Sequence, residues 1–234
     1  MYMDGWPGRH SAMQRHLPPP LLRLMPLGGS ITYGLGSSHG NGYRQALRDL
    51  LVADGHPVQM VGSRRAGTMS DNANEGWRGF TITQIEAKAR RYCIPPLLPN
   101  LVTLNAGSND CIQDLDLRSA SGRMADLLAF LWAASPGCTI LLSTLLVSCD
   151  EATQERVVRF NDALRELARR DALRDKRLVL VDMQGPDGPR RDQLVDGTHP
   201  NDDGYVRMAR IWHRGVGVAM AKGFLQPPTE DAPL

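Results

Sequence analysis

The feature that most constrains the fold is a regular alternation between two kinds of segment. Short apolar runs, rich in Leu, Ile and Val, predict buried strands, and longer segments whose apolar residues recur every three or four positions predict amphipathic helices. The predicted strands are 21–27, 58–62, 101–107, 139–147 and 177–183, and the predicted helices are 43–55, 82–92, 121–135, 152–170 and 203–221. Asn201 or Asp202 can cap the start of the last helix.

Strands that alternate with helices predict an α/β fold with a parallel sheet of about five strands, covered by helices on both faces. The 234 residues suffice for one domain of ordinary size with a sizeable core. We expect that domain to span residues 20–223, after a flexible leader at 1–19 and before a C-terminal tail at 224–234.

The composition argues against several classes of function. The 27 basic and 25 acidic side chains leave a net charge of +2, without the clustered positive charge that binding to nucleic acid or to a membrane surface needs. No run of about 18 apolar residues predicts a membrane span. The N-terminus lacks the apolar core of a signal peptide, so we expect a cytoplasmic protein or a secreted one whose signal has been removed.

The cysteines and histidines do not form a metal-binding pattern. Cys93, Cys111, Cys138 and Cys149 allow three disulfide pairings, but free buried thiols are the favoured interpretation. No CxxC, HxxxH or HExxH pair is present, and His10 and His16 lie in the leader. The sequence therefore predicts no metal and no cofactor.

The unusual residues lie in the loops after the first, third and fifth predicted strands. These loops read GGSITYG (28–34), NAGSNDC (105–111) and VDGTHPND (195–202). Ligands of parallel sheets bind at the carboxyl ends of the strands, so the three loops are expected to share one edge and to form the site.

A phosphate site is one alternative for the first loop. The Walker pattern requires lysine after GxxxxG, but Leu35 follows the glycine pair Gly29 and Gly34. The dinucleotide pattern GxGxxG also fails, because His39 stands where the third glycine belongs. A nucleotide site is therefore disfavoured.

A serine nucleophile is the other alternative. Ser30 would need a base, and His199 supplies one, with Asp196 three residues before it to orient the imidazole. Asn109 offers an amide for an oxyanion hole. Taken singly, Ser30 could be a helix cap and Asn109 and His199 ordinary loop residues, but their shared edge favours a joint site.

Four short blocks in this order resemble the SGNH, or GDSL-type, hydrolases: GGSIT, the glycine of WRGFTI, GSND and DGTHP. RLMPLGGSIT and DGTHPNDDGY further resemble the branch that holds acetyl xylan esterases and related carbohydrate esterases. The resemblance implies a three-layer α/β/α, flavodoxin-like fold and a metal-free esterase. It implies Ser30 as nucleophile, His199 as base and then acid, Asp196 as its partner, and an oxyanion hole of Ser30 N–H, Gly79 N–H and the Asn109 amide.

One position departs from the family pattern. The family usually has aspartate directly before the serine, and here that residue is Gly29. A carboxylate there would organise the nucleophile loop, so its loss is expected to weaken the enzyme without removing the nucleophile or the base.

The substrate is less constrained than the chemistry. Tyr33, Trp77 and Phe80 lie near the expected site, where they would stack on a sugar ring or pack within their loops. The favoured hypothesis is hydrolysis of small acyl esters, with O-acetyl groups on carbohydrate first. The alternatives are an intracellular esterase or acyltransferase acting on a lipid or specialised metabolite, and a binding protein that kept the fold and lost catalysis. The oligomeric state stays open.

Overall fold

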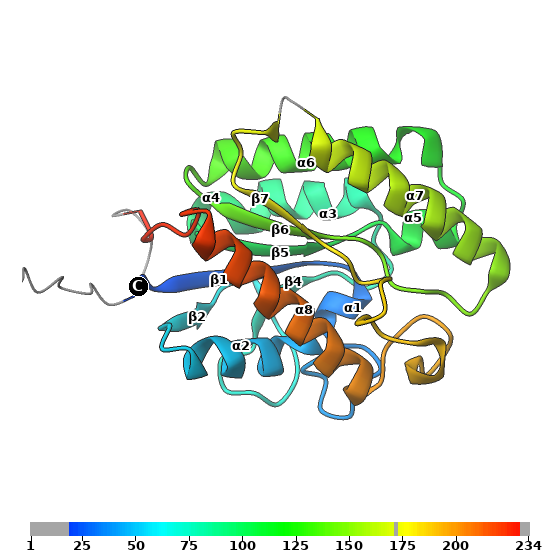
Figure 1. Cartoon of the computed structure of the whole chain (residues 1–234), viewed down its shortest axis with the longest axis horizontal. Coiled ribbons are helices and arrows are strands. Elements are labelled where there is room, and N and C mark those ends of the chain that lie inside the picture. The colour runs from blue at the N-terminus through cyan, green and yellow to red at the C-terminus, as the bar shows by residue number, and fades with distance from the viewer. Residues whose placement is uncertain (1–18, 171–172, 230–234) are drawn as a thin grey trace, which may run out of the picture.

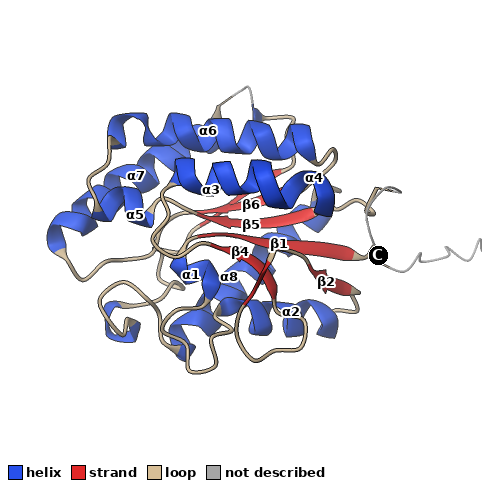
Figure 2. Ribbon diagram, turned by 180° about the vertical axis from the view of Figure 1, so that it is seen from behind, coloured by secondary structure: helices blue, strands red, loops and turns tan. Residues whose placement is uncertain are grey.

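The structure is a computed structural model that describes residues 19–170 and 173–229, with only the backbone at 92, 93 and 95 (Figure 1). The predicted leader, except for Pro19, lies outside the described residues, as does the side chain of Cys93. The described part of the chain forms a central sheet with helices on both faces, which confirms the three-layer α/β/α prediction (Figures 1 and 2).

The sheet is built around its first strand, β1 (Leu22–Gly28), which is buried along its whole length. On one flank β1 pairs in parallel with β5 (Leu101–Asn105), and beyond it lie β6 (Thr139–Ser143) and β7 (Leu178–Val181), also parallel. The other flank of β1 is shared: β2 (Val58–Met60) pairs with its beginning and β4 (Ala73–Gly76) with its end. A short strand, β3 (Arg64–Arg65), pairs antiparallel with β4.

The described sheet therefore has seven strands rather than the five predicted, because β3 and β4 were missed. Their composition explains this, since neither strand has a run of apolar or β-branched residues. In β4 the buried residues include Asn74 and Glu75, which are fully buried and satisfied locally. Asn74 accepts from the Gly76 N–H, and Glu75 accepts from the Ser63 N–H and the Trp77 indole.

One face of the sheet is covered by α3 (Ile82–Lys88), α4 (Ile94–Leu97), α5 (Ser108–Ile112), α6 (Leu117–Ala134) and α7 (Glu151–Arg169). The other face carries α1 (Ser30–Tyr33), α2 (Tyr43–Ala53) and α8 (Asp202–Ala221), with α2 and α8 packed on each other. Each face has its own apolar core, which is what a sheet with two buried sides requires. The Asn201 side chain caps α8, accepting from the Gly204 N–H at 3.0 Å.

Some element ends differ from the predictions. The predicted helix 82–92 is an α-helix only to Lys88 and continues as one π-helical stretch, η1 (Ala89–Cys93). The predicted strand 139–147 ends at Ser143, and α6 begins four residues before the predicted position 121. The first two differences arise because apolar residues are also buried in loops and at helix junctions. There they leave the same sequence pattern as in a strand or an α-helix.

The start of the predicted tail is attached to the body. Phe224 O accepts from the Thr139 hydroxyl at 2.8 Å, and Gln226 O accepts from the Asn100 amide at 2.7 Å. That amide also donates to Leu21 O at 2.8 Å, so one side chain joins both ends of the described domain. The junction lies at the edge of the sheet where the parallel strands begin, opposite their carboxyl ends. No described helix is both long and apolar enough to cross a bilayer.

Candidate active site

The first strand ends in two glycines that let the chain turn closely over β5. Gly28 pairs with Asn105, and a Cβ at Gly28 would overlap the Asn105 carbonyl oxygen, so only glycine fits there. Helix α1 begins two residues later with Ser30. The turn thus places the serine hydroxyl at the carboxyl edge of the sheet, where the sequence predicted the site.

Ser30, His199 and Asp196 form a continuous line of hydrogen bonds. The distance from Ser30 Oγ to His199 Nε2 is 2.7 Å, and the distance from His199 Nδ1 to Asp196 Oδ2 is also 2.7 Å. The histidine side chain is only 14% exposed, whereas that of Asp196 is 51% exposed. An ionised carboxylate on Nδ1 requires a proton on that nitrogen, which leaves Nε2 able to accept the serine proton.

The loop that carries the histidine is held by its own backbone. The Val195 N–H donates to His199 O at 2.9 Å, and the Cys149 N–H donates to Gly197 O at 3.0 Å. Asp196 accepts two further hydrogen bonds, from the backbone N–H groups of Thr198 and His199. The same carboxylate therefore shapes the loop and orients the imidazole.

These contacts also set the charge of Asp196. Partial desolvation raises its pKa, but hydrogen bonds from the His199 N–H, the His199 ring and the Thr198 N–H outweigh that effect and leave the pKa below its ordinary value. The carboxylate is consequently ionised throughout the range in which a histidine ordinarily titrates.

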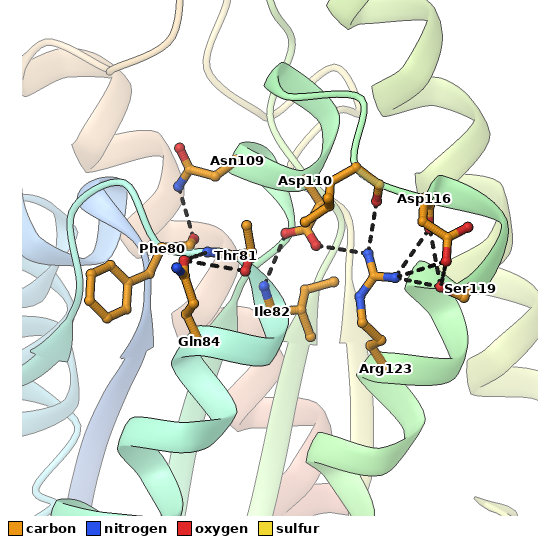
Figure 3. A network of polar contacts seen from close by, with 10 residues as sticks. Phe80, Thr81, Ile82, Gln84, Asn109, Asp110, Asp116, Ser119 and Arg123 are labelled. Carbon is orange, nitrogen blue, oxygen red and sulfur yellow. Dashed lines mark hydrogen bonds and ion pairs between the residues drawn. The ribbon is translucent and has the colours of Figure 1, made fainter.

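Asn109 is fixed by the neighbouring loop (Figure 3). Its amide nitrogen donates to Phe80 O at 3.0 Å, which uses one of its two N–H groups. The adjacent Asp110 is completely buried, and it accepts from the Ile82 N–H at 3.0 Å and from Arg123 at 2.9 Å. Asn109 and Asp110 thus tie the start of α3 to the start of α5.

Sequence reasoning missed the part played by Asp110 and Arg123. No role was predicted for Asp110 from the sequence, and Arg123 lies in a predicted amphipathic helix, where arginine is typical of a solvent-facing position. In the structure Arg123 also donates to Leu115 O, Asp116 O and the Ser119 hydroxyl (Figure 3). The sequence offered only an aspartate directly after the candidate oxyanion donor, and its burial is visible only in the structure.

Two small hollows lie next to the start of α1: Ser30 lines the first, and its neighbour Ile31 lines both. The first has a volume of about 10 Å³, enough for one water-sized group, and is lined by Gly29, Ser30, Ile31, Phe80, Asn105, Ala106, Gly107, Ser108 and Asn109. The second, of about 20 Å³, is mainly apolar. It is lined by Ile31, Ser108, Ile112, Leu146, Val147, Ser148, Thr153, Val157 and Thr198. We call the second hollow the apolar notch.

The two glycines singled out by the sequence have different surroundings, and only Gly29 lines the first hollow. Gly79 is exposed, has a φ of +78° and does not line the hollow. Gly29 has a φ of −91°, which any residue can adopt. A Cβ at Gly29 would lie 3.6 Å from the Asn109 amide nitrogen and 3.8 Å from Trp77 O, both ordinary contacts.

The three aromatic residues lie together and contact cationic side chains. Trp77 and Phe80 stack with their ring centroids 5.5 Å apart. Arg64 lies 4.4 Å from the Trp77 ring centroid and 5.6 Å from that of Tyr33, and Lys88 lies 4.7 Å from that of Trp77. Protein side chains therefore contact both the Trp77 and the Tyr33 rings, and both residues are half-buried.

The described cysteines Cys111, Cys138 and Cys149 are free. Burial raises the pKa of Cys111 to about 12 and raises that of Cys138 further. Cys149 is exposed, which corrects the prediction that the thiols are buried. Cys149 lies in the loop between β6 and α7 and not at the end of a strand. Within 19–170 and 173–229 no three His, Cys, Asp or Glu side chains cluster as a metal site would require.

Residues 27–207 match the GDSL-like Lipase/Acylhydrolase family. The chain belongs to this family. It has the α/β/α fold, and its blocks at 28–32, 107–110 and 196–200 all fall in the matched region. The sequence-based recognition of the GDSL-type hydrolases is thereby confirmed.

The similar proteins include carbohydrate esterases. The chain is 25% identical over 219 residues to a multidomain esterase of Ruminococcus flavefaciens and spans 28% of its length. A family 3 carbohydrate esterase of Clostridium thermocellum is 25% identical, with a TM-score of 0.76 over 86% of this chain and 98% of that one. Axe2, an acetylxylan esterase from Geobacillus stearothermophilus, shares the fold, with 18% identity and a TM-score of 0.65 over 86% and 96% of the two chains.

Proposed function

We propose that the protein is a serine esterase that removes small acyl groups, O-acetyl groups above all, from carbohydrate by way of an acyl-enzyme. The observation that carries the proposal is the hydrogen-bonded line from Ser30 through His199 to Asp196. A serine, its base and an orienting carboxylate in contact are the parts that nucleophilic acyl transfer needs.

In this mechanism Ser30 Oγ attacks the acyl carbon while its proton passes to His199 Nε2. The tetrahedral intermediate collapses when His199 returns that proton to the departing alcohol oxygen. A water then gives a proton to His199 and attacks the acyl-enzyme, and the acid leaves as Ser30 regains its proton. Asp196 stays ionised throughout, because its lowered pKa keeps it charged beside the imidazolium.

The oxyanion would be held by three donors. The Asn109 amide has a second N–H beyond the one bound to Phe80 O, and its position near Gly29 supports the assignment. The backbone N–H groups of Ser30 and Gly79 complete the proposed set. Removal of one such donor typically costs about 3 kcal/mol of transition-state stabilisation.

The acyl group would enter the apolar notch. The notch has room for about one or two small groups, and it lies between Ile31 and Thr198, the neighbours of Ser30 and His199. It therefore suits an acetyl methyl group and leaves no space for a long chain. The carbohydrate esterases among the similar proteins support a sugar as the alcohol part.

The first test is hydrolysis of p-nitrophenyl acetate, butyrate and octanoate by the wild type and by Ser30→Ala. We expect turnover of the acetate, less of the butyrate, little of the octanoate, and a loss of at least about 10³-fold in kcat for Ser30→Ala. Circular dichroism would show that the variant is folded. Equal activity of both proteins would contradict the proposal.

The second test uses acetylated xylo-oligosaccharides in water and in the presence of an acceptor alcohol. Acetate release favours the proposed hydrolysis, whereas transfer to the added alcohol favours the acyltransferase alternative. Sugar binding by a protein without turnover would favour the binding-protein alternative.

A further inference from the structure

The segment beside the aromatic residues carries an excess of positive charge. Residues 64–91 contain six basic side chains, Arg64, Arg65, Arg78, Lys88, Arg90 and Arg91, and three acidic ones, Asp71, Glu75 and Glu86. The three acids have other partners. Asp71 pairs with Arg48, Glu86 pairs with Arg90, and Glu75 is buried against Ser63 and the Trp77 indole.

Two of these arginines lack a carboxylate partner next to the site. Among the described residues, no carboxylate oxygen lies within 4 Å of the Arg64 or Arg78 guanidinium nitrogens. Arg64 Nε is also buried without a hydrogen-bond partner. A guanidinium group without a carboxylate partner can form a charge-assisted pair with an anion that binds beside it.

Aromatic rings hold both guanidinium groups near Ser30. Arg64 lies over Trp77 and Tyr33, and Arg78 lies 5.9 Å from the Tyr33 ring centroid. Tyr33 ends the short helix that Ser30 begins, and Arg78 directly precedes Gly79. We call Arg64, Arg78 and the Tyr33 ring between them the cationic rim.

The sheet order places the cationic rim and the apolar notch on opposite flanks of the nucleophile. Arg64 is in β3, and β3 and β4 lie on one side of β1. The notch is lined by Leu146 and Val157, which follow β6 on the other side. An ester with its acyl group in the notch would therefore direct its alcohol part toward the rim.

We propose that the cationic rim selects esters whose alcohol part bears a carboxylate, as the alcohol part of an O-acetylated acidic sugar does. This inference rests on the proposed function. Solvent reaches both guanidinium groups and screens their charge. Each arginine is therefore expected to change the preference for the anionic ester by about fivefold or less.

The experiment compares two acetyl esters that differ by one charge, 4-acetoxybenzoate and methyl 4-acetoxybenzoate. Each kcat/KM is divided by the rate constant for hydroxide hydrolysis of the same ester, which removes the difference in leaving-group reactivity. We expect the wild type to favour the anionic ester by about tenfold at low salt and to lose that preference as added NaCl screens the charges.

The variants separate charge from packing. Arg64→Gln with Arg78→Gln is expected to lower the anionic-to-neutral ratio at least fivefold, and Arg64→Lys with Arg78→Lys to keep most of it. Arg169→Gln, an exposed arginine at the far end of α7, is the matched control and should keep the wild-type ratio. If the double glutamine variant does not fold, Arg78→Gln alone and the salt dependence of the wild-type ratio test the inference.

The inference would be overturned if the anionic-to-neutral ratio were unchanged in the glutamine variants or insensitive to salt. Ser30-dependent hydrolysis of the neutral ester would in that case leave the proposed function intact. Failure of the wild type to hydrolyse either ester in a Ser30-dependent way would overturn both.

Discussion

The residue that departs from the family pattern stands in a site that could hold the usual one. Gly29 has an ordinary φ of −91°, and a Cβ there would make only ordinary van der Waals contacts, with Asn109 Nδ2 3.6 Å away. An aspartate side chain there could accept a hydrogen bond from the Asn109 amide or from nearby backbone N–H groups. Glycine in place of that aspartate therefore changes the electrostatics and the order of the loop, and it does not change the shape of the backbone.

We predict that Gly29→Asp folds and leaves kcat/KM for p-nitrophenyl acetate unchanged or up to about tenfold higher, because a carboxylate would order the nucleophile loop. Steady-state kinetics and thermal denaturation measure both effects. The matched control is Gly28→Ala, whose Cβ would overlap the Asn105 carbonyl oxygen and should lower stability by about 2 kcal/mol or more. A large fall in kcat/KM for Gly29→Asp would show instead that this loop needs glycine.

At the scale of elements, one buried ion pair, Asp110–Arg123, joins the start of α5 to α6, and its aspartate also accepts from the first residue of α3. Asp110 is inaccessible, Arg123 is 19% exposed on its side chain, and the pair bridges three segments of the chain. Breaking a buried pair on one side leaves a charge without compensation, which typically costs 3–5 kcal/mol. The ion pair therefore fixes the segment that carries Asn109, the proposed oxyanion donor.

We predict that Asp110→Asn lowers the free energy of unfolding by about 3 kcal/mol and lowers kcat about tenfold with little change in KM. The amide keeps an acceptor for the Ile82 N–H but offers no charge to Arg123. Urea denaturation and p-nitrophenyl acetate kinetics at a temperature where the variant is folded give the two quantities. Asp114→Asn, in the exposed turn after α5, is the control. If Asp110→Asn lost stability but kept its kcat, Asp110 would have a structural role only.

The sequence predicted these elements unevenly, for physical reasons. Apolar strands such as β1 and β5 were identifiable because burial on both faces leaves a continuous apolar run. The short strand β4 was not, because Asn74 and Glu75 satisfy their polar groups through contacts that become visible only in three dimensions. Ser30, Asp196, His199 and Asn109 could be placed at one edge because parallel strands bring their loops together. Arg123 could not, since nothing local separates a buried arginine from an exposed one.

At the scale of the molecule, several carboxylates are held ionised by the fold. Desolvation opposes ionisation at Asp182, but hydrogen bonds from the Gln184 N–H, Thr144 and Arg165 lower its pKa below the ordinary value. Asp196 follows the same pattern, and hydrogen bonds lower the pKa of Asp150 and Asp202. A group with a lowered folded-state pKa stabilises the fold above its unfolded-state pKa and loses that contribution as the pH falls.

We therefore predict that the free energy of unfolding changes little through these groups between pH 7 and pH 5 and declines below about pH 4. Asp182→Asn should flatten that acid decline, by less than about 1 kcal/mol because the carboxylate is partly exposed. Urea denaturation at a series of pH values from 3 to 7, monitored by circular dichroism, measures this decline in the free energy of unfolding. The exposed Asp126→Asn serves as control, and identical acid slopes for Asp182→Asn and the wild type would refute the assignment.

The order of the site residues along the chain has a consequence for synthesis. Ser30 and His199 are 169 positions apart, and His199 lies in the loop just before α8, the last helix described. A ribosome adds about 5–20 residues per second, so the proposed nucleophile emerges roughly ten to thirty seconds before its proposed base. During that interval the nascent chain holds a serine with no histidine to activate it. Catalytic competence would thus arrive late in translation, which makes ester hydrolysis a sensitive reporter of completed folding.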